Sequence, residues 1–286
     1  MLRLLIGSFF AVTFAQAFAA SVTVSGVQMP AWVVRNGQQA PLKVGTVLIN
    51  SDQLRTGSGA RILLRLQDGS SVKLGGNATL RLDELNEGKD IFSAALQVIK
   101  GAFRFSTDLL MKDNRRNVRV LIGTATIGIR GTDVWGKATK EKDIVCLLEG
   151  KITVDRGTDP QVVMQDPLTF YIAPKDQPAQ ALAPVPLEQL AEWAKETDIQ
   201  AGQGAARMGG KWKVYLMSTE LQSEALQAYD TLSDAGYAVD ISPLTRNGVT
   251  EYRLRIPNLP SRKESEALAK HLQGQPGVGK TSISMR

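Results

Sequence analysis

One aromatic residue and several cationic residues lie at alternate positions in two stretches near the C-terminus of this 286-residue chain. Lys213, Tyr215 and Met217 alternate with apolar residues, and Arg253 and Arg255 do the same in a later stretch. Because successive side chains of a β-strand point to opposite faces, each set would share one face of a sheet. A tyrosine ring packs on the C–H faces of a sugar, while cationic groups donate hydrogen bonds to its hydroxyls. This spacing therefore predicts a carbohydrate-binding surface.

The elements that would position these residues form two copies of one small unit. Each copy has an alternating strand, an amphipathic helix ended by a glycine, and a second strand. The predicted elements are strand 212–216, helix 219–235 before Gly236, strand 237–241, strand 252–256, helix 261–273 before Gly274, and strand 281–285. The helices carry the capping-box pairs Thr219–Gln222 and Ser261–Glu264.

This order predicts a small α+β domain of the βαββαβ (ferredoxin-like) type over residues 211–286, with two helices on one side of four strands. The other face of the sheet would stay open to solvent, and Ser282 and Ser284 of the last strand would join the residues on it. The pattern alone leaves an alternative open, namely that this face is only the solvated side of an antiparallel sheet.

The runs Trp212–Leu216, Ala235–Tyr237 and Tyr252–Ile256 resemble a SPOR domain, and the resemblance extends from Lys211 to the end of the chain. SPOR domains are bacterial envelope modules that bind peptidoglycan glycan strands stripped of their stem peptides. The resemblance therefore implies that denuded glycan is the ligand. The chain departs from the family pattern at Tyr215, where glutamine is usual, and in the residues that follow each odd strand.

The sequence offers few residues of the types that commonly carry out catalysis. The single cysteine, Cys146, lies in an apolar run and is predicted to be a buried structural thiol, and the single histidine, His271, is predicted on a helix surface. Zinc sites and Cys–His or Ser–His pairs need more such residues close together. Carboxylates are present, but their spacing suggests no glycosidase pair. We predict a non-enzymatic protein with no cofactor and no metal.

Residues 1–19 have the features of a secretory signal peptide. One positive residue, Arg3, precedes an apolar segment from Leu4 to Phe14, and small residues follow at Ala17 and Ala19. No later stretch is apolar enough to span a membrane. The mature protein is thus predicted to be periplasmic, released by cleavage of the signal peptide.

Residues 22–157 are predicted to form an all-β domain of the roll, sandwich or solenoid-like type, because short alternating strands are separated by turn sequences. Asp68-Gly69 is a strong hairpin signal between two of them. The predicted strands are 46–49, 60–66, 71–74, 79–82, 102–106, 118–122 and 144–154.

A glycine-rich segment stands out in this region, and we interpret it as a structural turn. Its glycines allow sharp bends, and its arginine lies between apolar and glycine residues as if it reached an interior where Asp133 could pair with it. A phosphate loop is excluded because no Gly-Lys-Ser/Thr sequence between a strand and a helix is present. The residues of this turn are Gly128, Arg130, Gly131, Thr132 and Asp133.

The same segment, with Arg55–Arg61, Gly101–Phe105 and Leu148–Ile152, resembles the FecR domain over most of residues 39–155. FecR-domain proteins of the signalling type carry a cytoplasmic anti-sigma segment and a membrane span ahead of this domain. A predicted signal peptide precedes it here, so the sigma-factor role is not expected to transfer. The resemblance implies no catalytic residue.

Residues 158–210 are predicted to be a Pro/Gly-rich linker with one helix at 187–197, which would act as a tether. The formal net charge of +6 favours acidic envelope partners, whereas export argues against nucleic acid. We therefore expect a periplasmic protein that localises to peptidoglycan, at division or remodelling sites, and presents its FecR-like domain to an unknown envelope protein. The alternative is an envelope-sensing or regulatory component whose C-terminal module is a protein docking surface.

Overall fold

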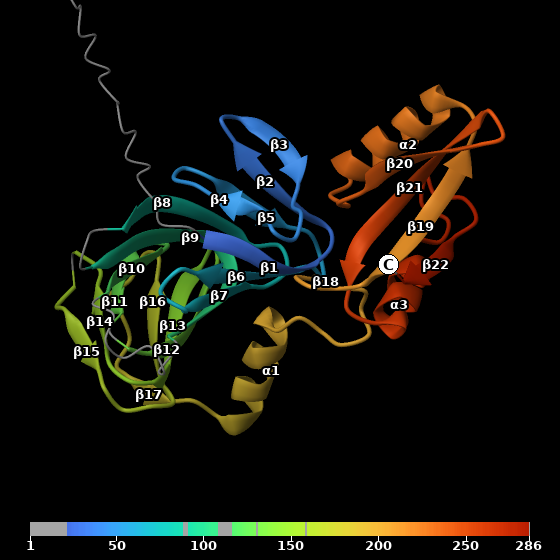
Figure 1. The fold of residues 1–286 in the computed structure, drawn as a ribbon. Helices are drawn as coiled ribbons and strands as arrows, with labels where there is room; N and C mark the ends of the chain where they lie inside the picture. Colours follow the sequence, from blue (N-terminus) through green and yellow to red (C-terminus); the bar gives the residue numbers. More distant parts are fainter. Residues whose placement is uncertain (1–21, 88–90, 108–115, 130, 158, 286) are drawn as a thin grey trace, which may run out of the picture.

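The computed structural model describes residues 22–87, 91–107, 116–129, 131–157 and 159–285. The predicted signal peptide and Arg130 lie outside the described residues. The described chain forms a large β domain followed by one helix and a small α+β domain, as the sequence predicts (Figure 1).

The β domain and the connecting segment contain most of the strands. They are β1 (Val22–Gln28), β2 (Ala31–Arg35), β3 (Gln38–Pro41), β4 (Val47–Leu48), β5 (Gln53–Thr56), β6 (Arg61–Leu66), β7 (Ser71–Leu74), β8 (Thr79–Glu87), β9 (Phe92–Ser106), β10 (Arg116–Ile122), β11 (Ala125–Ile129), β12 (Asp133–Ala138), β13 (Lys142–Glu149), β14 (Ile152–Asp155), β15 (Val162–Met164), β16 (Thr169–Pro174), β17 (Ala183–Pro184) and β18 (Ala206–Arg207).

The three helices and the strands of the small domain complete the described fold. They are α1 (Leu187–Thr197), β19 (Trp212–Thr219), α2 (Gln222–Asp234), β20 (Asp240–Arg246), β21 (Val249–Leu259), α3 (Arg262–Leu272) and β22 (Ser282–Met285).

The β domain consists of two sheets that share the long strand β9. Its first part pairs with β8 and, in parallel, with β10, whereas its last part pairs with β7 and β12 in the other sheet. The strand changes sheets at Gly101, which has φ +89°, and a Cβ there would lie 2.6 Å from the Cα of Ala78. Glycine is required here because a side chain would meet both a strained backbone angle and a neighbouring backbone.

The space between the sheets is filled by the inward residues of each strand. In β6, for example, Ile62, Leu64 and Leu66 are buried, while the residues between them are not. The period of two therefore explains why these segments form strands with one face in the core. Every strand predicted from the sequence is present, but the predicted strand 144–154 is divided at Gly150, which has φ +88°, into β13 of one sheet and β14 of the other.

The hairpin predicted at Asp68-Gly69 joins β6 to β7. Only Gly69 has a positive φ, +84°, so the turn is not the type that needs positive φ at both positions. The carboxylate of Asp68 instead accepts hydrogen bonds from the backbone N–H and the hydroxyl of Ser70, at 3.0 and 2.8 Å. A carboxylate that satisfies nearby backbone donors stabilises such a turn.

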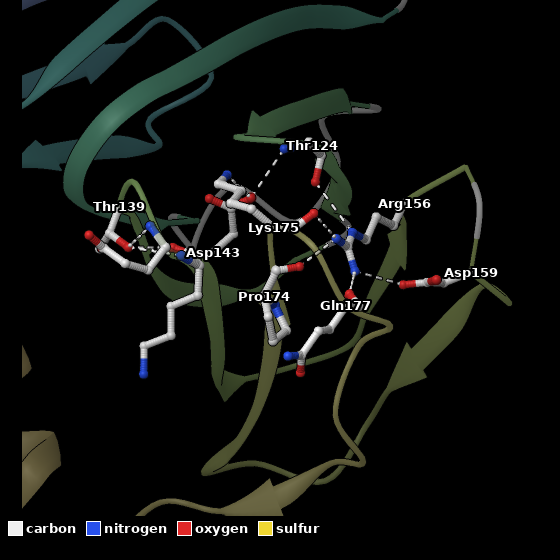
Figure 2. Close-up of polar contacts among 10 residues, drawn as sticks. Thr124, Thr139, Asp143, Arg156, Asp159, Pro174, Lys175 and Gln177 are labelled. Carbon is white, nitrogen blue, oxygen red and sulfur yellow. Dashed lines mark hydrogen bonds and ion pairs between the residues drawn. The ribbon is translucent and has the colours of Figure 1, made fainter.

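The first half of the predicted linker belongs to the β domain. Strand β16 pairs with β13 over six residues, and β15 pairs with β14. Figure 2 shows how Arg156 fixes this segment: its guanidinium donates to the carbonyls of Pro174 and Gln177, at 2.6 and 2.8 Å, and to the carboxylate of Asp159 at 3.0 Å. The tether interpretation is therefore wrong for residues 162–184, because strand residues lie between the prolines and pair with the β domain.

Helix α1 is also fixed to the β domain. The indole of Trp193 stacks on that of Trp135 at 4.4 Å between ring centroids and meets Phe170 edge-on at 6.3 Å. Two ion pairs flank the helix and its end, Lys137–Glu196 at 2.9 Å and Lys73–Asp198 at 2.6 Å. An aromatic stack of this size anchors a helix, so this part of the connection is not a tether either.

The small domain has the predicted split βαβ arrangement. The strand order is β20-β21-β19-β22, and both helices pack on one face of the sheet, over the buried Val214, Leu216, Leu254 and Ile256. The predicted strand 237–241 begins later than expected, at Asp240.

The capping pairs predicted for the two helices differ from those in the structure. Ser261 caps α3 by accepting from the backbone N–H of Glu264 at 3.2 Å, as predicted. Helix α2, however, begins after Leu221 without a side-chain cap, and Thr219 accepts instead from the N–H of Leu221 at 3.1 Å. The pairing Thr219–Gln222 is therefore wrong.

Several contacts hold the two domains against each other. The backbone N–H of Ala31 donates to the carbonyl of Gly236 at 3.1 Å, and the indole N–H of Trp32 donates to the carbonyl of Asp234, also at 3.1 Å. The second half of the connection is held by Glu264, whose carboxylate accepts from the N–H groups of Gly202 and Gly204 at 2.5 and 2.7 Å. The two domains thus meet along an ordered junction.

Candidate functional site

The face of the small sheet opposite its helices carries most of the residues predicted to bind carbohydrate; we call it the open face. Antiparallel register places Arg255 of β21 opposite Tyr215 of β19, and Tyr215 opposite Ser282 of β22. Directly paired residues share a face of the sheet. Lys213 and Ser284 form the next pair on this face, and Arg253 lies opposite Ser218.

Met217 is the exception, and its predicted position is wrong. A β-bulge between Tyr215 and Met217 shifts the register, so Met217 pairs with the buried Leu254. Met217 packs against the core and, with Ala228 and Thr231 of α2, lines a groove on the helix side. The extra residue of the bulge reverses the alternation, so Ser218 takes the place on the open face that was expected for Met217.

Tyr215 lies at the centre of a cationic group on the open face. The ammonium of Lys213 lies 5.6 Å from the centroid of its ring, and the guanidinium of Arg253 lies 5.0 Å from it. Both distances are within the range of cation–π attraction. Burial tends to raise the pKa of Tyr215, but hydrogen bonds from Lys213 and Arg255 and the charges of Lys213 and Arg253 outweigh it, and the pKa lies below its ordinary value.

The two arginines of this face are partly buried. The Nε atoms of Arg253 and Arg255 are shielded from solvent and have no hydrogen-bond partner within the described chain. Their side chains, like those of Tyr215 and Lys213, are partly exposed, and Ser282 is exposed. The face therefore presents a flat aromatic ring between hydrogen-bond donors, a set of groups that suits a sugar ring and its hydroxyls.

The segment predicted as a structural turn connects β11 in one sheet to β12 in the other. Gly131 has φ +67°, and the backbone N–H of Thr132 donates to the hydroxyl of Thr107 at 3.2 Å. Asp133, which was expected to pair with Arg130, forms a two-bond ion pair with Arg104 at 2.6 and 2.9 Å. Gly128 lies within β11, where a Cβ would come within 2.8 Å of the hydroxyl of Thr153.

The described ranges contain no group of side chains suited to binding a metal ion. No set of three or more His, Cys, Asp and Glu residues there could hold a metal ion. Cys146 is fully buried, and burial raises the pKa of its thiol to about 12, so it stays protonated at neutral pH. His271 is exposed on α3, as predicted.

Comparison with protein families identifies both domains. The FecR protein family profile matches residues 52–153, and the SPOR domain profile matches residues 209–279. The chain contains a FecR domain and a SPOR domain, and we call it the FecR–SPOR protein. Neither domain belongs to an enzymatic family, both indicate an envelope location, and the SPOR domain indicates peptidoglycan binding in general.

Comparison with solved structures gave distant matches. Two crystal structures of a candidate anti-sigma factor from Parabacteroides distasonis, at 1.65 and 2.50 Å resolution, are similar to the FecR–SPOR chain at 17% identity and a TM-score of 0.41. The matches cover 82% and 79% of this chain and 99% and 91% of the other. The search of curated proteins gave no match. None of the helices in the described part of the chain is long and apolar enough to cross a membrane.

Proposed function

We propose that this FecR–SPOR protein localises to peptidoglycan by laying a denuded glycan strand on the open face of its SPOR sheet. The observation that carries the proposal is the partly exposed ring of Tyr215, which lies between three cationic side chains on the face opposite the helices. The ring would pack on the C–H face of a sugar, and Lys213, Arg253 and Arg255 would donate to its hydroxyls.

Removal of the stem peptides matters in this mechanism because the binding surface is flat. A strand lying on a sheet must bring its sugars within van der Waals distance of the tyrosine ring, and bulky peptides on the same side would hold it away. The FecR domain, fixed to the SPOR domain at the junction, would be carried to the same sites, such as those of division or remodelling, and would present its surface to an envelope protein there.

A sedimentation experiment tests this function. Isolated peptidoglycan, with and without amidase treatment, is mixed with the protein made without residues 1–19 and spun down. We expect the bound fraction to increase after amidase treatment, because denuded strands accumulate. The variant with Tyr215, Arg253 and Arg255 all replaced by alanine should lose this binding and keep the circular dichroism spectrum of the parent, since none of the three is buried.

The opposite results would point to the alternative role. If amidase treatment does not increase binding, or if the triple variant still sediments with denuded peptidoglycan, the open face is not a glycan platform. A docking surface for another envelope protein would then be the better account of the SPOR domain.

A further inference from the structure

The junction between the two domains contains a crevice of about 230 Å³. Its floor is apolar and comes from both domains, with the buried Met29 and Leu42 on the side of the β domain and Ala238 on the SPOR side. Its rim is polar and includes Lys43 and Asp240. The volume is below the roughly 300–1,000 Å³ of pockets for drug-sized ligands, so it suits one small substituent and not a whole oligosaccharide.

This crevice lies at the end of a row of polar side chains that crosses the open face. Asp240 of β20 is paired with Arg255, which is paired with Tyr215, which is paired with Ser282. Neighbouring strands are about 4.8 Å apart, so this row is about 14 Å long. The ammonium of Lys43, from the β domain, lies 2.7 Å from the carboxylate of Asp240 and continues the row across the domain boundary.

The ion pair at the end of the row is easily exchanged for a ligand. The side chains of Lys43 and Asp240 are 48% and 36% exposed. Exposed pairs of this kind contribute little to stability, because water competes for both partners. Lys43 can therefore turn from Asp240 to a ligand acceptor at little cost, while the buried floor beneath it stays in place.

We propose that the crevice is a further subsite of the glycan-binding surface, in which the FecR domain holds the acetamido group of an N-acetylated amino sugar. The methyl of the acetamido group would contact Met29 and Ala238, and its carbonyl would accept a hydrogen bond from Lys43. An acetamido group has an apolar methyl and a carbonyl that accepts hydrogen bonds. The crevice offers a partner for each of them. The proposal rests on the proposed function, because the same strand would lie on the open face.

The walls of the crevice are fixed relative to each other, which a composite subsite requires. The backbone N–H of Ala238 donates to the sulfur of Met29 at 3.4 Å. A Cβ on Gly236, which has φ +86°, would lie 2.6 Å from the indole of Trp32, so the two domains are in close contact beside the crevice. Binding there would not require the domains to be brought together first.

The test uses a hexasaccharide from amidase-treated peptidoglycan and the protein made without residues 1–19. We expect Lys43→Ala and the crevice-filling Ala238→Leu each to weaken binding about tenfold, or about 1.4 kcal/mol, in calorimetric titrations. Lys151→Ala is the control, because Lys151 is an exposed lysine of the same domain that does not line the crevice. This variant should bind the hexasaccharide as tightly as the parent does. Small-angle scattering checks that Ala238→Leu keeps the two domains together.

A second measurement locates the ligand directly. With methyl-labelled methionine and alanine, the acetyl protons of the bound hexasaccharide should show nuclear Overhauser effects to Met29 and Ala238. If the parent binds the hexasaccharide but Lys43→Ala keeps its affinity and these effects are missing, the subsite is refuted and the open-face proposal stands. If the parent does not bind the hexasaccharide, the proposed function fails and the subsite fails with it.

Discussion

The outer face of the β domain around Trp135 is covered by helix α1, whereas the outer face of the SPOR sheet around Tyr215 is left open. On the first face the outward residues are apolar or aromatic, among them Ile144, Cys146 and Phe170, and they form a second core with Trp193 of the helix. On the open face the outward residues are cations, serines, one tyrosine and, on the edge strand β20, the acidic Asp240.

The difference shows how outward residues decide whether a sheet face acquires a cover. Burying the indole of Trp193 removes a large apolar area from water, which offsets the entropy lost when α1 is ordered. A helix placed over Lys213, Arg253 and Arg255 would instead have to desolvate three charges. The connection between the domains therefore covers one sheet and leaves the other available for a ligand.

Removing the aromatic anchor of α1 should have the largest effect. Trp193 is 6% exposed and stacks on Trp135, so Trp193→Ala leaves a cavity and should lower the free energy of unfolding by about 3–5 kcal/mol. Urea unfolding followed by circular dichroism measures this. Leu187→Ala changes a residue of the same helix that is 73% exposed and should alter stability little. Equal effects of the two substitutions would contradict the covered-face interpretation.

Removing the contact that fixes the glycine-rich part of the connection should lower the free energy of unfolding by less. Glu264→Ala leaves the N–H groups of Gly202 and Gly204 without their acceptor. Hydrogen bonds to a charged group contribute about 1.5–3 kcal/mol, so we expect stability to fall by about 2 kcal/mol. Residues 200–206 should also exchange their amide hydrogens faster in mass spectrometry. Glu266→Ala, which removes only a surface pair with Arg262, is the control, and unchanged exchange in Glu264→Ala would count against this contact.

On the open face the expected effect is on binding and not on stability. Tyr215→Ala should weaken binding of denuded glycan by about 1–2 kcal/mol, as expected for an aromatic residue at the centre of a contact surface, and titration calorimetry measures it. Tyr215→Phe keeps the ring and should lose less. Met217→Ala is the matched control, because Met217 lies on the helix side. An affinity loss for Met217→Ala as large as that for Tyr215→Ala would mean that the ligand binds the other side.

The period of two predicted much of this comparison from the sequence. It placed Tyr215, Arg253 and Arg255 together because their strands are regular where these residues lie. It failed at Met217, since a bulge inserts one residue into the register and alternation cannot reveal where a strand departs from its own period.

The roles of Trp135 and Trp193 were missed for a different reason. Their contact joins residues far apart in the chain, and the helical stripe on α1 indicated an apolar face without indicating its partner. Likewise, strand β16 was hidden because its partner β13 comes from another part of the chain. The junction at Lys43 and Asp240 could not be predicted, because no local pattern encodes contact between two domains.

The smallest expected effect is on the ionisation of Tyr215. Burial raises the pKa of both Tyr171 and Tyr237, whereas the cations around Tyr215 lower its pKa despite partial burial. A titration followed by ultraviolet absorbance should therefore show a tyrosine that ionises below the ordinary value, and Tyr215→Phe should remove that part of the curve. A depressed pKa means that the ionised form is favoured by folding, so this contribution to stability is present in alkaline solution and lost as the pH falls through the folded pKa. Parent and Tyr215→Phe should thus differ in stability at alkaline pH more than at neutral pH.

If the variant titrates like the parent, the cations do not lower the pKa of Tyr215 as the geometry indicates. The open face would then not differ electrostatically from the covered face.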